Sequence, residues 1–170
     1  MHISGAISGA ITDPFSKEAL EHAEKYYKEI RHRKDDVDKI AKFTGYTSAQ
    51  ILRVKNYLFI DEHILSDGTR RFDPCFEITE SWQRLSDMQD YVQPHDLLLI
   101  PHERMEASLV DNGMSQYDAH LETCKTYNYP KETEKFYEEL QTKKHTKIGK
   151  GKIVSGGITH QGRDDWDLYV

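Results

Sequence analysis

The chain has 170 residues, of which 37% are hydrophobic and 31% charged, and a formal net charge of −6. This length suits one domain with a real hydrophobic core, and the acidic balance argues against unaided, nonspecific binding to a phosphate backbone. No apolar run reaches the roughly 18 residues that a membrane span needs, and no signal-peptide pattern opens the sequence, so we expect a soluble chain without a membrane span.

The two cysteines, Cys75 and Cys124, lie far apart in the sequence and lack CxxC spacing. This spacing implies neither a disulfide framework nor a zinc site built from cysteines. We interpret both as ordinary buried or half-buried thiols.

The N-terminal part of the chain predicts a linker followed by a helix. Residues 1–12 repeat SGAI, which is typical of a flexible linker, and Asp13-Pro14 can begin a helix that runs to about Arg33. The apolar residues on one face of this helix are Leu20, Ala23, Tyr27 and Ile30. The residues on the opposite face are His22, Tyr26, Glu29 and Arg33. This second face is either a solvated surface or a source of a base and a cation for a site.

Residues 40–59 have the layout of a helix-turn-helix. A short helix capped by Asp35 or Asp36 ends at Gly45, and Thr47 with Gln50 forms a capping box for the next helix. The second helix offers cations for a phosphate backbone, but two-helix corners of this kind are also common packing units. Both interpretations remain open at this point.

Residues 61–74 form a polar connection with a strong turn signal at Asp67-Gly68, which predicts a small hairpin. Arg70 and Arg71 follow directly, and guanidinium groups bind phosphate oxygens through two parallel hydrogen bonds. They are the best local candidates for a phosphate clamp, with surface salt bridges as the alternative. Asp73-Pro74 then opens another helix.

The most apolar stretch, residues 95–120, carries the densest group of potential ligands. Pro101 leaves two possibilities: a buried strand over 96–100 with a helix from Pro101, or one kinked helix from His95 to about Val110. In either case His102 and Glu106 of the HExxE string lie one turn apart on one face. Asn112-Gly113 predicts the end of this helix, and Ser115 with Asp118 begins the next one, which carries His120.

Two kinds of chemistry fit this cluster. His102, Glu106 and His120 can bind a divalent metal ion, namely zinc, manganese or magnesium, with Glu103 left to activate a bound water. Without a metal, His and Glu side chains near arginines can cleave a phosphodiester by general acid and base catalysis. The pool of residues for this chemistry is His22, Arg33, Arg70, Arg71, His95, His102 and Glu103. No organic cofactor is indicated.

The C-terminal part predicts one more helix after Tyr129-Pro130 and then a tail. The tail has a basic run of lysines separated by glycines and an acidic, aromatic end. A concentrated positive charge of this kind can steer a nucleic-acid strand. We expect a linker over 1–12, a mainly helical, compact domain with a small hairpin over 13–141, and a flexible tail over 142–170.

Several segments together resemble a known family. These segments are HAEKYY (22–27), IAKFTGY (40–46), RRFDP (70–74), ESWQRL (80–85), HDLLLIPHERMEA (95–107) and MSQYDAH (114–120). The series, covering about residues 4 to 130, resembles a C-terminal domain of bacterial polymorphic toxins of the contact-dependent inhibition and Rhs kinds, also found at the C-terminus of phage minor head proteins. Pro101 departs from that pattern.

The resemblance implies an effector that a larger secreted or surface polypeptide delivers into the cytoplasm of a neighbouring cell, where a cognate immunity protein neutralises it. Expressed alone, the chain would be cytoplasmic. Many such domains are nucleases, so we predict a toxin-type hydrolase of RNA or DNA with His102, Glu103 and His22 as catalytic residues. Substrate phosphate would be held by Arg33, Arg70 and Arg71. The alternatives are a zinc-dependent peptidase built on HExxE and a non-enzymatic module that binds nucleic acid or protein.

Overall fold

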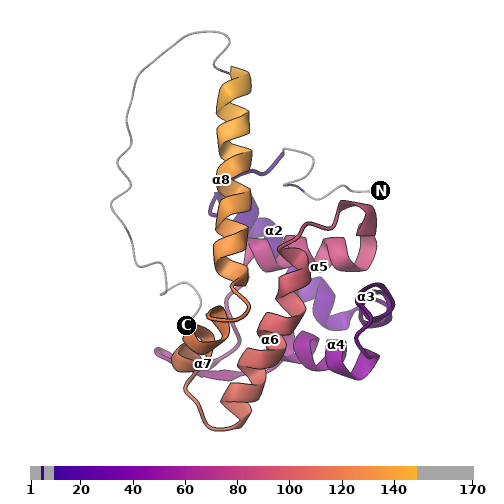
Figure 1. Ribbon diagram of the computed structural model, residues 1–170, viewed down its shortest axis with the longest axis vertical. Coiled ribbons are helices and arrows are strands. Elements are labelled where there is room, and N and C mark those ends of the chain that lie inside the picture. The colour runs from indigo at the N-terminus through magenta and orange to yellow at the C-terminus, as the bar shows by residue number, and fades with distance from the viewer. Residues whose placement is uncertain (1–4, 6–9, 149–170) are drawn as a thin grey trace.

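The computed structural model describes residue 5 and residues 10–148 and is mainly helical, as predicted (Figure 1). The first half of the chain contains α2 (Lys17–His32), α3 (Asp36–Thr44), α4 (Ser48–Lys55), the π-helical turn η1 (Asn56–Ile60), β1 (His63–Leu65) and β2 (Gly68–Arg70). The second half contains α5 (Phe76–Asp87), the 3₁₀ turn η2 (Gln89–Tyr91), α6 (Asp96–Asp111), α7 (Gln116–Cys124) and α8 (Tyr129–Ile148).

Helix α6 lies in the middle of the fold and packs against α4, α5, α7 and α8. The upper part of α8 extends beyond the other helices in Figure 1, and α7 lies at its opposite end beside α6. The two strands form an antiparallel hairpin in which His63 pairs with Arg70 and Leu65 with Gly68. The hairpin predicted at Asp67-Gly68 is confirmed, and Gly68 supplies the positive φ of 131° that its turn needs.

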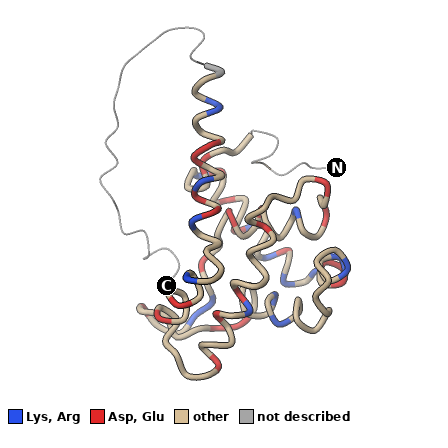
Figure 2. The backbone as a smooth tube through the Cα atoms, in the orientation of Figure 1, with Lys and Arg blue, Asp and Glu red and all other residues tan. Residues whose placement is uncertain are grey.

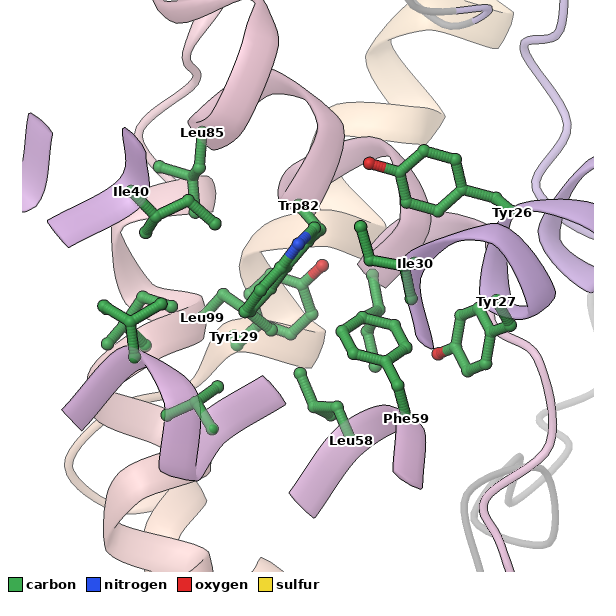
Figure 3. Close-up of a cluster of buried hydrophobic side chains, with 14 of the residues drawn as sticks. Tyr26, Tyr27, Ile30, Ile40, Leu58, Phe59, Trp82, Leu85, Leu99 and Tyr129 are labelled. Carbon is green, nitrogen blue, oxygen red and sulfur yellow. The ribbon is translucent and has the colours of Figure 1, made fainter. Parts of the chain in front are cut away.

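Trp82 of α5 is the centre of the main hydrophobic core, with no exposed surface (Figure 3). Its ring packs edge-on against Phe59 at 5.1 Å between centroids, and Phe59 in turn packs against Tyr27 at 4.7 Å. The indole nitrogen donates a hydrogen bond to the buried carboxylate of Asp36 at 3.0 Å, and Lys55 donates to the same carboxylate at 2.8 Å. This carboxylate therefore ties α3, α4 and α5 together around the core.

A second buried ion pair fixes the start of α6 against α5. Arg84 donates two hydrogen bonds of 2.7 Å to Asp96, and Ser81 donates another of 2.6 Å to the same carboxylate. All three side chains are fully buried. A bidentate guanidinium–carboxylate pair fixes the relative orientation of its two groups as well as attracting them. This pair therefore fixes where α6 begins relative to α5.

The structure decides between the two possibilities for residues 95–110. One helix, α6, runs from Asp96 to Asp111 with Pro101 inside it, so no strand precedes Pro101. The two-helix corner is also present: Gly45 ends α3 with a φ of 81°, and Thr47 and Gln50 form the predicted capping box of α4. At Ser115, the hydroxyl accepts the backbone N–H of Asp118 and caps α7 as expected.

Three predictions near the ends of the chain need correction. Ser16, not Asp13, caps α2, and the buried face of α2 includes Ala19 and Tyr26, whereas Leu20 is 50% exposed. The buried stripe is rotated because α2 packs on α5 as well as on η1. Helix α8 continues through Ile148, so residues 142–148 are helical where we predicted tail. The basic run beyond Ile148 lies outside the described residues.

Charged residues of both signs are interspersed along the described chain (Figure 2). On α8, for example, lysines and glutamates are mixed, and Lys135 with Glu132 and Lys143 with Glu139 lie within ion-pair distance. Among the helices of the described part, none has the length and apolar character that crossing a bilayer requires.

We predict that acid destabilises the fold partly through His95. This side chain is 3% exposed, and its Nε2 lies 3.2 Å from the guanidinium of Arg84, which can only donate. Burial lowers the pKa of His95 to about 4, with Arg84 lowering it further and Asp96 opposing. Because the unfolded chain binds this proton near pH 6.5, stability should fall by up to about 3 kcal/mol as the pH is lowered from 7 to 4.

The test is chemical unfolding at several pH values between 4 and 7. The His95→Gln variant keeps a hydrogen-bond acceptor but cannot titrate, so its free energy of unfolding should change less steeply than that of the wild type. The matched control is His145→Gln, because His145 is exposed on α8. Parallel pH profiles for the wild type and His95→Gln would contradict the prediction.

Candidate functional site

Beyond Asp96 at its start, helix α6 presents three more buried ionisable side chains to the interior: His102, Glu103 and Glu106. His102 and Glu106 lie one helical turn apart, with 3.3 Å between Nε2 and Oε2. The single continuous helix makes this approach possible, because residues four apart share a face. The HExxE string is therefore a buried cluster and not a solvated face.

The carboxylate of Glu106 accepts hydrogen bonds from other elements as well. His120 of α7 approaches Oε2 through Nδ1 at 2.8 Å, and Tyr57 of η1 donates to Oε1 at 2.9 Å. Gln116, at the start of α7, donates both to Oε1 and to the Tyr57 hydroxyl, the latter at 2.6 Å. Glu106 thus joins η1, α6 and α7 through one buried anion.

The proton affinities follow from these contacts. Burial alone would raise the pKa of Glu106, but the hydrogen bonds from His102 and His120 outweigh it and bring that pKa down to about 2. Burial likewise lowers the pKa of His120, yet its contacts with Cys124 and Glu106 raise it to about 9. Both shifts favour the charged forms of this buried pair, an imidazolium and a carboxylate.

The pKa of Glu103 is shifted in the opposite direction to that of Glu106. Burial and the nearby negative charge of Glu106 raise the pKa of Glu103 to about 8, against a smaller opposing effect of His102. A carboxyl group with such a pKa is largely protonated at neutral pH but can still lose its proton. This is the property of a general acid or base that works near neutrality.

A cavity adjoins this cluster. Its volume is about 40 Å³, which is room for roughly three water molecules. The polar side chains in its wall are Tyr27, Arg70, Asp73, Cys75, His102, Glu103, Glu106, Gln116, His120 and Tyr129. Ionisable groups that can serve as acid, base and cation therefore line the same pocket beside the hairpin.

Cys124 joins the cluster although we did not predict it. It follows His120 by one turn of α7, and its Sγ lies 3.5 Å from the His120 Nε2. His102, His120 and Cys124 each have a ligand atom within 4.8 Å of the others, so this group can hold a metal ion. The HxxxC spacing of His120 and Cys124 is the sequence signal that would have indicated it. Tyr57 carries no such signal, because the π-helical turn positions it.

Two predicted site residues lie elsewhere. His22 is on α2, with its Nε2 3.6 Å from the buried Glu80, and it is not part of the cavity wall. Arg33 donates to Asp35 and Asp87 on the surface between α2 and α5, and it too is absent from the cavity wall.

The Arg70-Arg71 pair is close to the cavity. Arg70 lines it, but its guanidinium donates to the exposed carboxylates of Asp67 and Asp73 at 2.9–3.0 Å. Arg71 donates through Nε to the carbonyl of Ile60 at 2.9 Å and is exposed. Exposed ion pairs contribute about 0–1 kcal/mol, so an incoming phosphate can replace the aspartates around Arg70.

Comparison with known proteins adds no relative to this description. No family model matches the chain, and neither does any curated protein or solved structure. The resemblance to polymorphic toxin domains therefore stays a prediction from the sequence.

We predict that Glu106 is essential to the stability of the cluster. The Glu106→Gln change keeps the shape but removes the charge and places an NH₂ group among the donors of Tyr57, Gln116 and His120. Losing one partner of a buried charged network costs about 3–5 kcal/mol. Urea unfolding followed by the fluorescence of the two tryptophans should show this loss.

The matched control for this measurement is Glu122→Gln. Glu122 is half-buried on α7, and its partner is the exposed Lys125, so its change should cost less than about 1 kcal/mol. Equal effects of the two substitutions would contradict a structural role for the Glu106 carboxylate.

Proposed function

We propose that the chain is a toxin-type hydrolase domain that cleaves nucleic acid at the cavity beside α6. The observation that carries this proposal is the wall of that cavity, in which Glu103, a carboxyl group with a pKa of about 8, lies together with the guanidinium of Arg70. Proton transfer and stabilisation of phosphate charge are the two functions that phosphodiester cleavage requires. The sequence resemblance to polymorphic toxin domains supports the same class.

Each side chain has a role in this proposal. For an RNA substrate, the 2′-oxygen attacks phosphorus and the bond to the 5′-oxygen breaks. Glu103 exchanges a proton with one of these two oxygens, and water or a second side chain exchanges the other. Arg70 and Arg71 hold the phosphate oxygens. Arg71 is outside the cavity wall but directly follows Arg70, which lines it. His22 and Arg33 have no role in the proposal, because they lie outside the cavity wall and their contacts are with Glu80, Asp35 and Asp87.

The proposal includes a biological setting that the resemblance implies. A larger polypeptide would deliver the domain into the cytoplasm of a neighbouring cell, and a cognate immunity protein would neutralise it. The acidic net charge of −6 means that the contact with nucleic acid is local, made by the arginines near the hairpin and by the lysines at the C-terminal end.

A zinc-dependent peptidase is the second candidate. Glu103 directly follows His102, as the general base follows a zinc-binding histidine in the HExxH peptidases, and the cluster can hold a metal ion. Cleavage of a denatured protein with intact RNA and DNA would favour this candidate over the first. Binding of nucleic acid without turnover would favour the non-enzymatic alternative.

We predict that the purified chain cleaves total RNA or plasmid DNA in a gel assay and that Glu103→Gln lowers the rate by at least about 100-fold. The amide has nearly the same shape but cannot transfer a proton, and general acid or base catalysis contributes about 10²–10⁴-fold. The control, Glu122→Gln, should cleave at the wild-type rate. Intact nucleic acid under all metal conditions would overturn the proposal.

We also predict that Arg71→Ala raises KM about tenfold and reduces the salt dependence of cleavage, because one phosphate contact is lost. Lys28→Ala is the control, since Lys28 lies on the exposed face of α2 in an ion pair with Glu24. Kinetics at two salt concentrations give both quantities. If Arg71→Ala changed neither KM nor the salt dependence, the phosphate would be held elsewhere.

A further inference from the structure

His102, His120 and Cys124 converge from two helices on one small volume. His102 comes from the middle of α6, and the other two occupy one face at the end of α7. One ligand atom of each lies within 4.8 Å of the others. His102 is 1% exposed and His120 7%, so the convergence takes place in the protein interior.

The hydrogen bonds of the two imidazoles decide which nitrogen faces the thiol. The Nδ1 of His102 lies 2.6 Å from the carbonyl oxygen of Tyr127, which can only accept, so Nδ1 carries the proton. The Nδ1 of His120 lies 2.8 Å from the carboxylate of Glu106 and carries its proton for the same reason. In both rings Nε2 is therefore the nitrogen with which a metal ion can bond. The Nε2 of His102 also lies 3.3 Å from the Glu106 carboxylate, so metal binding replaces that contact.

This arrangement is the usual outer shell of a metal site. Histidines that bind metal ions almost always donate the other ring N–H to a carboxylate or a backbone carbonyl, which fixes the tautomer and orients the ring. Here one histidine has the carbonyl and the other has the carboxylate. The Tyr127 carbonyl and the Glu106 carboxylate thus each fix a proton on Nδ1, which leaves the Nε2 atom of each histidine as the possible metal ligand beside the Cys124 sulfur.

The distances agree with a tetrahedral ion. With Zn–N near 2.0–2.1 Å and Zn–S near 2.3 Å, a tetrahedral site places N and S about 3.6 Å apart and two nitrogens about 3.3 Å apart. Cys124 Sγ and His120 Nε2 are already 3.5 Å apart. The ligand nitrogen of His102 lies within 4.8 Å of the other two ligand atoms, so His102 has to move closer when the ion binds.

We propose that His102, His120 and Cys124 are the protein ligands of one zinc ion, with Glu106 and the Tyr127 carbonyl in its outer shell. Two imidazoles and a thiolate favour zinc over magnesium or manganese, which prefer oxygen ligands. Zinc binds the thiolate form of cysteine and an unprotonated nitrogen of histidine, so binding at this site releases protons. Glu106, which we predicted as a ligand, instead orients His120 in this proposal, and the Tyr127 carbonyl orients His102.

Three protein ligands leave a fourth position for water or substrate, as in catalytic zinc sites and unlike closed structural ones. His102 and His120 also belong to the cavity wall that contains Glu103 and Arg70. The inference therefore deepens the proposed function by naming its cofactor. The use of the ion in hydrolysis rests on the proposed function, whereas the binding of the ion does not.

The experiment measures metal binding by the full chain directly. The chain is stripped with a chelator and then titrated with Zn²⁺, and zinc content is measured after desalting; Co²⁺ replaces zinc in a parallel titration. We expect one zinc per chain, a thiolate-to-cobalt charge-transfer band in the near ultraviolet and the strong visible bands of tetrahedral cobalt. Protein that retains no zinc would overturn the proposal.

Variants test each ligand role. Cys124→Ser should lose the charge-transfer band and bind zinc at least about 100-fold more weakly, whereas the matched control Cys75→Ser should keep both the band and the stoichiometry. Glu106→Gln should keep the band but weaken zinc binding about 10–100-fold, as loss of an outer-shell partner does. Circular dichroism checks that each variant is folded. Wild-type affinity in folded Cys124→Ser would overturn the proposal.

Metal binding and hydrolysis are measured separately, so the two proposals can fail separately. Stoichiometric zinc with uncleaved nucleic acid and protein supports the zinc site and contradicts the hydrolase. Cleavage by a chain that binds no zinc contradicts the zinc site alone.

Discussion

The buried carboxylate of Glu106 is the constraint on which this part of the structure depends. An unpaired charge in the interior is expensive, and this one is tolerated because donors from η1, α6 and α7 surround it. Each donor in turn fixes its own element: the π-helical turn that carries Tyr57, the helix that carries His102, and the start of α7. The same anion therefore sets the packing of three elements and the orientation of both imidazoles in the candidate site.

Much of the fold could be predicted because its signals are local. Helix caps at Thr47 and Ser115 and the turn at Gly68 act within a few residues, and each lies where the sequence placed it. Face assignments on α2 were less accurate, since the burial of Tyr26 and the exposure of Leu20 depend on where α5 packs. Pro101 could not be resolved from the sequence, because tertiary contacts on α6 outweigh the cost of a proline within a helix.

The candidate site was also predictable only in part, because some of its contacts are local in sequence and others are tertiary. Residues one turn apart, such as His102 and Glu106, must be neighbours in any helix, and His120 follows after one short connection. Tyr57 is 49 residues from Glu106, and no sequence spacing links them. His22 of α2 and Arg33, which follows the last residue of α2, have the right chemistry but contact α5 instead.

Stability and chemistry are coupled in this cluster, and the coupling decides which substitutions are informative. A change at Glu106 removes a structural anion and disturbs both histidines, so lost activity in that variant would not distinguish unfolding from lost catalysis. Glu103 is different, because it lines the cavity, and the bonds that Tyr57, Gln116 and His120 make to Glu106 do not involve it. A carboxyl group that is buried beside a network it does not support has its proton affinity raised while contributing little to the fold. Such a position is where a functional role is separable from a structural one.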